Sequence, residues 1–162
     1  MANKLNQLDL IAMEQQRFKP VELTVEANGE QYSITIQKKF KDTEIARIFT
    51  ELVKRSDCAR EQKLDFDILG TILILLIKHF TDIGFIKCET IEEEMESEIR
   101  ALNALIDLGL FEQIVSEFDQ AEIDRLSEMF EKHKDSVKRI SDNFIAKEFE
   151  TIKPEKKKKV TK

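Results

Sequence analysis

The sequence predicts an α+β fold that is predominantly α, with an N-terminal β-hairpin packed on a helical bundle and a long C-terminal helix. Only four Gly and two Pro occur in 162 residues, which favours long helices because both residue types are costly inside them. Residues 21–36 alternate between apolar and polar, whereas from residue 42 onward the apolar period lengthens to about 3.6 residues. Hydrophobic residues make up 41% of the chain, which is enough to build a core.

Residues 1–19 are expected to form an N-terminal arm or a short helix, because apolar residues recur there at intervals of three and four. The next two segments flank Asn28-Gly29, and both of these residues tolerate the positive φ angles of a type I′ turn. The sequence therefore predicts a hairpin over 21–36. One apolar face is expected, made of Val21, Leu23 and Val25 on the first strand and Tyr32, Ile34 and Ile36 on the second. Since an isolated two-stranded sheet is marginal, something must cover that face.

Residues 20–150 are expected to be a single α+β domain in which everything after the hairpin is helical. Asp42 or Thr43 is placed to cap the first of these helices, which carries an apolar stripe on one side. The segment 66–85 is apolar around nearly its whole circumference, which predicts a central buried helix, and Gly84 is expected to end it.

Further helices are marked by their end signals. Thr90 and Glu93 have the spacing of a capping box, and the acidic run that follows suits a helix N-terminus. Gly109 predicts a break, and Asp119 is placed to cap the last helix. That helix has a seam with alternate spacings of three and four, made of Ile123, Leu126, Phe130, His133, Val137, Ile140 and Phe144. Residues 151–162 are basic and poor in apolar residues, so a disordered tail is expected.

Composition narrows the function classes. A net charge of −6 argues against nucleic-acid binding, which needs concentrated cationic surface. Cys58 and Cys88 are too few for a disulfide framework and lack metal-ligand spacing, so they are expected to be free thiols in a reducing compartment. The N-terminus lacks a signal-peptide core, and the longest apolar stretch is too short to span a bilayer. We therefore expect no membrane association, and a location in the cytoplasm.

The sequence offers no constellation for catalysis, so we expect no enzyme and no cofactor or metal. His79 and His133 are interpreted as structural or surface residues, because no Cys or acidic residue recurs with them at ligand spacing. No two glycines lie within ten residues of each other, which excludes the Gly-rich phosphate loops. The acidic cluster from Glu89 to Glu98 is interpreted as a solvated helix start, with an electrostatic docking face for a basic partner as the alternative.

Protein binding is therefore the function class that the residues favour. The predicted contact residues are Phe130, Val137, Ile140 and Phe144 on the seam, with Ile34 and Ile36 of the hairpin as the second choice. The seam could instead fold back on the body of the protein, and the edge of the hairpin could be covered internally.

Three stretches together resemble tail assembly chaperones of long-tailed bacteriophages that infect Gram-positive bacteria. They are VELTVEANGEQYSITIQKKFKDTEIARIFTELVKR from Val21 to Arg55, then LGTILILLIKHFTDIGF, and then NALIDLGLFEQIVSEF. The resemblance covers roughly residues 20 to 150 and rests on the order of a short hairpin followed by a helical bundle. It implies a non-enzymatic helper that coats the tape measure protein and recruits tail tube subunits in the cytoplasm of the bacterial host cell. Nucleic acid is not among the expected partners, because of the net negative charge.

Two further expectations concern a longer form of the protein and its self-association. Family members often have a longer form made by ribosomal frameshifting, and the four lysines from Lys156 to Lys159 are where A-rich slippery codons are expected. Self-association of the chain is a second expectation from the seam. The alternative to the chaperone is an acidic regulatory adaptor that binds a host or phage protein through its glutamate-rich region.

Overall fold

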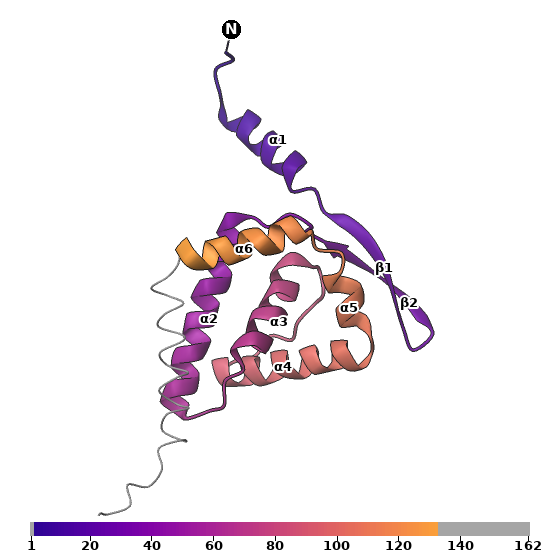
Figure 1. The fold of residues 1–162 in the computed structure, drawn as a ribbon, viewed down its shortest axis with the longest axis vertical. Helices are drawn as coiled ribbons and strands as arrows, with labels where there is room; N and C mark the ends of the chain where they lie inside the picture. Colours follow the sequence, from indigo (N-terminus) through magenta and orange to yellow (C-terminus); the bar gives the residue numbers. More distant parts are fainter. Residues whose placement is uncertain (1, 133–162) are drawn as a thin grey trace, which may run out of the picture.

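The computed structural model describes residues 2–132 of the chain. Within that range the elements, in chain order, are α1 (Gln7–Arg17), β1 (Val21–Ala27), β2 (Glu30–Ile36), α2 (Asp42–Gln62), α3 (Ile68–Phe80), α4 (Ile91–Asp107), α5 (Leu110–Val115) and α6 (Gln120–Lys132). This confirms the predicted α+β class with mostly α structure. Figure 1 shows α3 in the middle of the helices, the hairpin on one side of them, and α1 extending away from the rest.

The hairpin has the predicted turn and register. Asn28 and Gly29 both have positive φ, at 53° and 76°, as a type I′ turn requires. The strands pair antiparallel, with Val21 opposite Ile36, and Val25 opposite Tyr32. Val25 and Ala27 are buried, and α5 packs against their strand. The apolar face of the hairpin is therefore covered by its own chain along part of its length.

Backbone pairing between β2 and the chain after α3 ties the hairpin to the central helix. The amide of Gln37 donates to the carbonyl of Phe80 at 2.8 Å, and Ile36 forms an isolated bridge with Thr81. The backbone N–H of Thr35 donates to the Asp82 carboxylate at 2.7 Å. These contacts require an extended chain immediately after Phe80.

This extended chain corrects the sequence-based prediction for the central helix. The helix α3 ends at Phe80, and Thr81 adopts extended dihedral angles of −133° and 167°. Gly84 lies outside the helix, so the prediction that it ends the helix is wrong. Apolar residues continue to position 85 because the segment that follows α3 also packs on the core, with Ile83 and Phe85 partly buried against it.

The start of α2 also differs from the prediction. Lys41 is the N-cap residue and makes no capping hydrogen bond with its side chain, so neither Asp42 nor Thr43 caps the helix. The carboxylate of Asp42 instead pairs with Arg125 of α6. Asp42 therefore forms an ion pair with α6 and does not cap α2.

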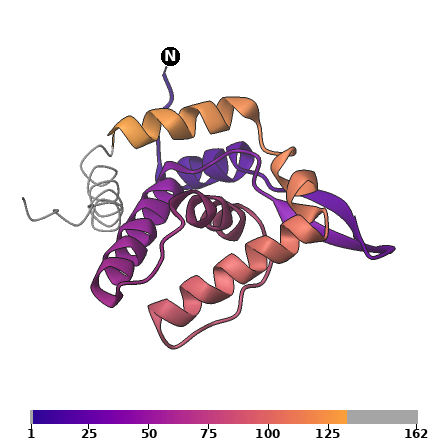
Figure 2. The same ribbon diagram turned by 60° about the horizontal axis from the view of Figure 1, so that its bottom comes forward.

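Two residues of α6 bind the backbone just before α2. The guanidinium of Arg125 donates to the carbonyl of Phe40, and the Glu122 carboxylate accepts the Phe40 N–H at 2.7 Å. Arg125 and Glu122 also pair with each other at 2.7 Å. This tie fixes α6 across the start of α2, a position that Figure 1 and Figure 2 both show.

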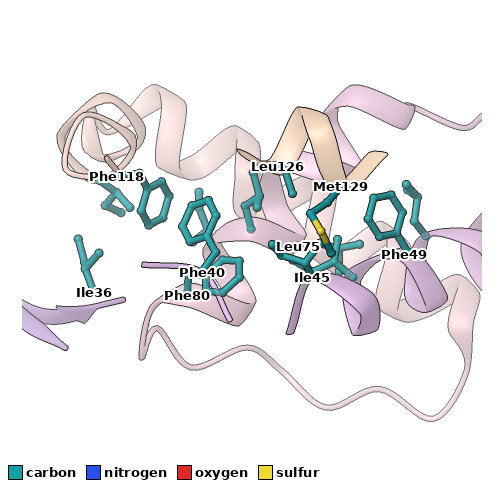
Figure 3. Close-up of a cluster of buried hydrophobic side chains, with 14 of the residues drawn as sticks. Ile36, Phe40, Ile45, Phe49, Leu75, Phe80, Phe118, Leu126 and Met129 are labelled. Atoms are coloured by element: carbon teal, nitrogen blue, oxygen red, sulfur yellow. The ribbon is translucent and has the colours of Figure 1, made fainter. Parts of the chain in front are cut away.

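The core is an elongated cluster shared by the hairpin and the helices (Figure 3). At its centre Phe40 stacks on Phe80 with ring centroids 4.2 Å apart, and Phe118 meets Phe40 edge-on at 5.3 Å. Leu126 and Met129 of α6 are buried in the same cluster. The first part of the predicted C-terminal seam therefore folds back on the body of the protein.

The boundaries of α4 and α5 follow their local signals. The Thr90 hydroxyl accepts the N–H of Glu93 at 3.2 Å, which confirms the predicted cap of α4. Gly109 has a φ of 70° and stands between α4 and α5, which confirms the predicted break. An L residue is strained at such a φ, so the glycine lets the chain turn from one helix to the next.

Candidate functional site

The structure tests only part of the predicted contact surface. Val137, Ile140 and Phe144 lie outside the described residues. Phe130 belongs to α6, but its side chain lies outside the described part of the chain as well. The outer portion of the seam therefore stays a prediction.

The two hairpin residues are placed clearly. Ile34 and Ile36 belong to the core, with 9% and 0% of their surface exposed. They face inward because the register that pairs them with Leu23 and Val21 turns the apolar side of the hairpin toward the helices. The hypothesis that they contact a partner therefore needs correction, since a fully buried side chain packs within its own chain.

Part of the acidic cluster is internal to the protein. Glu98 accepts two hydrogen bonds from Arg55 of α2, at 3.0 Å from Nε and 2.8 Å from Nη2. Only 4% of each of these two side chains is exposed. The bidentate geometry matches the planar guanidinium to the carboxylate, which offsets the cost of desolvating both charges. Glu98 is therefore a structural residue that joins α4 to α2.

Lys78 extends the same network to the central helix. Its ammonium group lies 2.8 Å from Glu94 and 3.0 Å from Glu98. Burial by itself would lower the pKa of Lys78, but the hydrogen bonds that it donates to these two carboxylates, together with their negative charges, outweigh burial and raise the pKa. Three helices thus meet at one group of alternating charges. The interpretation of the acidic run as a solvated helix start applies to Glu89, Glu93 and Glu96, which are exposed.

His79 lies between two carboxylates of α2. Its Nδ1 is 2.9 Å from Glu44, and its Nε2 is 2.9 Å from Glu51. Burial by itself would lower the pKa of His79, but the two hydrogen bonds and negative charges outweigh burial and raise the pKa above 6.5. Because both of its ring nitrogens are paired with carboxylates of α2, His79 holds α2 and α3 together.

Cys58 lies in surroundings that favour the protonated thiol. Burial raises the pKa of the Cys58 thiol, and the charge of Glu92 raises it further, so the reactive thiolate is disfavoured. Within the described residues, no group of three or more His, Cys, Asp or Glu side chains is placed to hold a metal ion. The described part of the chain also carries two apolar grooves.

The first groove, here called the α4 groove, lies between α4 and the extended segment 83–86. Its volume is about 680 Å³. Small side chains at Ser97, Ala101 and Ala104 line it along one face of α4, where a helix could approach closely. The same helix contributes the charged lining residues Glu93, Glu96 and Arg100, and the remaining lining residues are Ile83, Gly84, Phe85, Ile86, Leu105 and Leu108.

The second groove, here called the α3–α6 groove, has a volume of about 490 Å³. Its lining residues come from α3, α5, α6 and the α5–α6 connection: Ile72, Leu73, Leu76, Val115, Ser116, Phe118, Gln120, Ile123 and Leu126. One turn before Leu73 on α3, Leu69 is 67% exposed and extends the apolar surface beyond the groove. The α3–α6 groove and the exposed side chain of Leu69 therefore together form an apolar surface.

Neither groove was predicted from the sequence. The apolar segment 66–85 predicted a central helix buried by neighbours on several sides, and Leu69 and Leu73 leave one side of α3 accessible. The signal that could have indicated the α4 groove is the spacing of Ser97, Ala101 and Ala104. Small residues at intervals of four and three mark a helix face that a neighbour can approach.

Comparison with known proteins identifies the family of the chain. A family model described as YomO matches residues 6–161, which is nearly the whole chain. No curated protein and no solved structure matches the chain. None of the helices described for residues 2–132 is both long and apolar enough to cross a membrane. The YomO family is phage-derived, and the chain belongs to it, which makes it a bacteriophage-type protein.

Proposed function

We propose that this chain is a non-enzymatic tail assembly chaperone that binds the tape measure protein and recruits tail tube subunits in the host cytoplasm. Membership in a phage-derived family supports the phage origin of this function. The resemblance of residues 20–150 to tail assembly chaperones supports the specific role. The single structural observation that carries the proposal is the α3–α6 groove.

The α3–α6 groove suits a long helical client. Seven of its nine lining side chains are apolar, and helix-in-groove recognition uses such a channel to hold residues at positions i, i+3, i+4 and i+7 of the guest. Apolar lining accepts many sequences, since hydrophobic contacts have little directional preference. A chaperone that coats a long client needs this tolerance.

Charged residues beside the groove serve solubility. Asp119 and Asp124 are exposed at the start of α6, close in sequence to the lining residues Gln120 and Ile123. Like-charged surfaces keep copies of a protein with an open apolar groove from aggregating. The groove can therefore stay accessible until the client binds.

The second candidate function is an acidic regulatory adaptor. The observation that favours it is the exposed acidic group at the start of α4, Glu89, Glu93 and Glu96. Glu94 and Glu98 are already engaged by Lys78 and Arg55, so the charge on offer to a basic partner is smaller than the sequence implies. We therefore place the adaptor second.

Binding of tape measure protein fragments to the purified chain tests the proposal. Calorimetry with overlapping helical fragments should detect binding by the wild-type protein. Leu73→Asp should abolish binding, because it places a charge in the apolar channel. Leu64→Asp is the matched control, since Leu64 is 37% exposed, follows the end of α2, and lies outside both grooves. Circular dichroism of both variants should match that of the wild type.

Ionic strength separates the two candidate functions. Apolar binding should persist when salt rises from about 0.1 M to about 0.5 M, whereas binding through exposed glutamates should weaken markedly because salt screens the charges. A tape measure protein that does not bind, or binding that Leu73→Asp leaves unchanged, would refute the chaperone proposal at this groove. Binding lost on Glu93→Gln/Glu96→Gln substitution and in salt would favour the adaptor.

A further inference from the structure

The helix α1 is exposed on every side. None of its eleven residues is buried, and Leu8, Leu10, Ile11 and Met13 are between 41% and 78% exposed. Among the described residues, Glu14 of α1 forms an ion pair with Lys41 at 2.9 Å, and Lys41 also lies over the ring of Phe18, the residue that ends α1. An isolated helix of this length is marginal in water, so a partner surface that covers it would stabilise it.

Leu8, Ile11 and Ala12 share one face of α1, because their spacing of three and four returns to the same side of a helix. Leu10 and Met13 lie on the other side. The first three residues therefore form a stripe that a groove could hold. This stripe is called the α1 stripe below.

The α4 groove has the dimensions to receive this helix. Between Glu93 and Leu108 it follows α4 for about 22 Å, and α1 is about 16 Å long, at 1.5 Å per residue. The small side chains of Ala101 and Ala104 in its lining let another helix approach. The walls of Ile83, Phe85 and Leu105 offer apolar surface on both sides.

A molecule's α1 is far from its own α4 groove. In Figure 1 α1 and α4 lie at opposite ends of the body, and in Figure 2 α4 is in front while α1 lies behind α6. Only residues 18–20 connect α1 to β1. A connection of three residues spans about 10 Å at most, which is too short to carry α1 around the body.

We propose that α1 of one copy of this chain docks in the α4 groove of a second copy, with the two helices antiparallel. Charges favour this register. Asp9 flanks the α1 stripe, and in this orientation it can pair with Arg100, a lining residue of the groove. Reciprocal exchange gives a closed two-fold dimer, the commonest symmetric assembly.

The dimer does not depend on the proposed function. The α3–α6 groove assigned to the client is lined by none of the α4-groove residues. Binding of a client at Leu73 and pairing of copies through α1 are therefore separable by mutation. The two proposals can fail independently.

Sedimentation equilibrium of the full chain tests the proposal. The wild type should have the mass of two copies. Leu8→Asp/Ile11→Asp should weaken the dimer by about 100-fold or more, because both charges enter an apolar groove. The matched control is Leu10→Asp/Met13→Asp, on the other side of the same helix, which should leave the dimer intact. None of these four residues is buried, so circular dichroism should show an intact fold in both variants.

Substitutions in the groove complete the test. Ala104→Asp should give a monomer, whereas Asn103→Asp, an exposed position of α4 outside the groove, should not. Mixing Ala104→Asp with Leu8→Asp/Ile11→Asp should restore a two-copy complex, because one chain keeps its arm and the other keeps its groove. Arg100→Glu should weaken the dimer, and adding Asp9→Arg should restore it.

Three results would overturn the proposal. A wild-type monomer at every concentration would mean that no second copy covers α1. A dimer that survives Leu8→Asp/Ile11→Asp would place the interface elsewhere. Failure of the two defective chains to combine, with both correctly folded, would show that α1 and the α4 groove do not meet.

Discussion

The side-chain amide of Gln113 binds both backbone groups of Glu26. Its oxygen accepts the Glu26 N–H at 3.1 Å, and its nitrogen donates to the Glu26 carbonyl at 3.1 Å. The register places these backbone groups on the outer edge of β1, where a third strand would pair. One glutamine therefore occupies the position of a neighbouring strand and closes this part of the edge.

We predict that Gln113→Glu lowers the free energy of unfolding by about 1 kcal/mol, since a carboxylate can accept from Glu26 but cannot donate to its carbonyl. Urea unfolding measures the change. Hydrogen exchange should also show faster exchange of the Glu26 amide in Gln113→Ala. Gln31→Ala, at an exposed position of the partner strand, is the control and should be nearly neutral.

Removing only one residue of the buried pair Arg55 and Glu98 should lower the free energy of unfolding strongly. Arg55→Ala leaves the buried Glu98 with Lys78 as its remaining partner, 3.0 Å away, which should destabilise the protein by about 3 kcal/mol. The double variant Arg55→Met/Glu98→Leu should recover most of that loss, because it removes both charges while Lys78 and Glu94 keep each other as partners. Chemical denaturation of the three proteins provides the comparison. A double variant as unstable as Arg55→Ala would mean that the charges themselves stabilise the fold.

Stability should depend on pH through His79. Its pKa in the folded protein is raised above 6.5, so its contribution is fully present below pH 6.5 and is lost as pH rises through the folded value. We expect a lower melting temperature at pH 8 than at pH 6. His79→Gln should remove this difference, because glutamine does not titrate. An unchanged pH dependence in His79→Gln would assign the effect to other groups.

The pairing of Glu51 with His79 should also stabilise the protein less at low pH. Burial by itself would raise the pKa of Glu51, but its hydrogen bond to His79 and the positive charges of His79, Arg55 and Lys78 together outweigh burial and leave the pKa below 4.5. A lowered carboxyl pKa contributes stability that is present above pH 4.5 and is lost as pH falls through the folded value. Melting temperatures should therefore be highest between these limits, and Glu51→Gln should flatten the acid side of the profile.

The aromatic cluster should depend most on its central ring. Phe40 is completely buried and contacts both Phe80 and Phe118, so Phe40→Ala should cost about 3–5 kcal/mol. Phe40→Leu should cost less, since it keeps most of the buried volume. Thermal unfolding distinguishes the two. Equal losses would mean that ring stacking, and not filled volume, sets the contribution.

Gly109 should matter for its backbone angle alone. A Cβ at this position would meet no atom within 4 Å, yet the φ of 70° is one that L side chains rarely adopt. We predict that Gly109→Ala costs about 1 kcal/mol, and that Gly109→Asn costs less because asparagine tolerates this region. Denaturant midpoints of the two variants measure the difference. Loss of similar size in both would point to a steric cause.

Local signals predicted much of the fold. The Asn28-Gly29 turn determined the hairpin register, because a two-residue loop leaves a single way to pair the flanking strands. Thr90 and Gly109 set helix boundaries through short-range hydrogen bonding and backbone freedom, both of which are readable from neighbouring residues. Features that depend on a few adjacent residues were therefore accessible from the sequence.

Long-range contacts were not accessible in the same way. The end of α3 at Phe80 is imposed by pairing with β2, more than forty residues earlier, as in the contact between Asp82 and Thr35 that spans 47 positions. The burial of Arg55 follows from Glu98, 43 residues away. A charged residue beside the apolar stripe of α2 looks solvated until its distant partner is known. The candidate grooves share this dependence, since each lies between elements distant in sequence.

The extended segment that follows α3 also has a consequence for how the family can diversify. A helix tolerates insertion of one residue poorly, because every later side chain then rotates by about 100°. A stretch outside regular structure absorbs such a change locally. As Ile83 and Phe85 form one wall of the α4 groove, insertions or deletions between α3 and α4 can widen or narrow this channel while the helices stay in phase. A change of loop length alone can thus alter the width of the α4 groove.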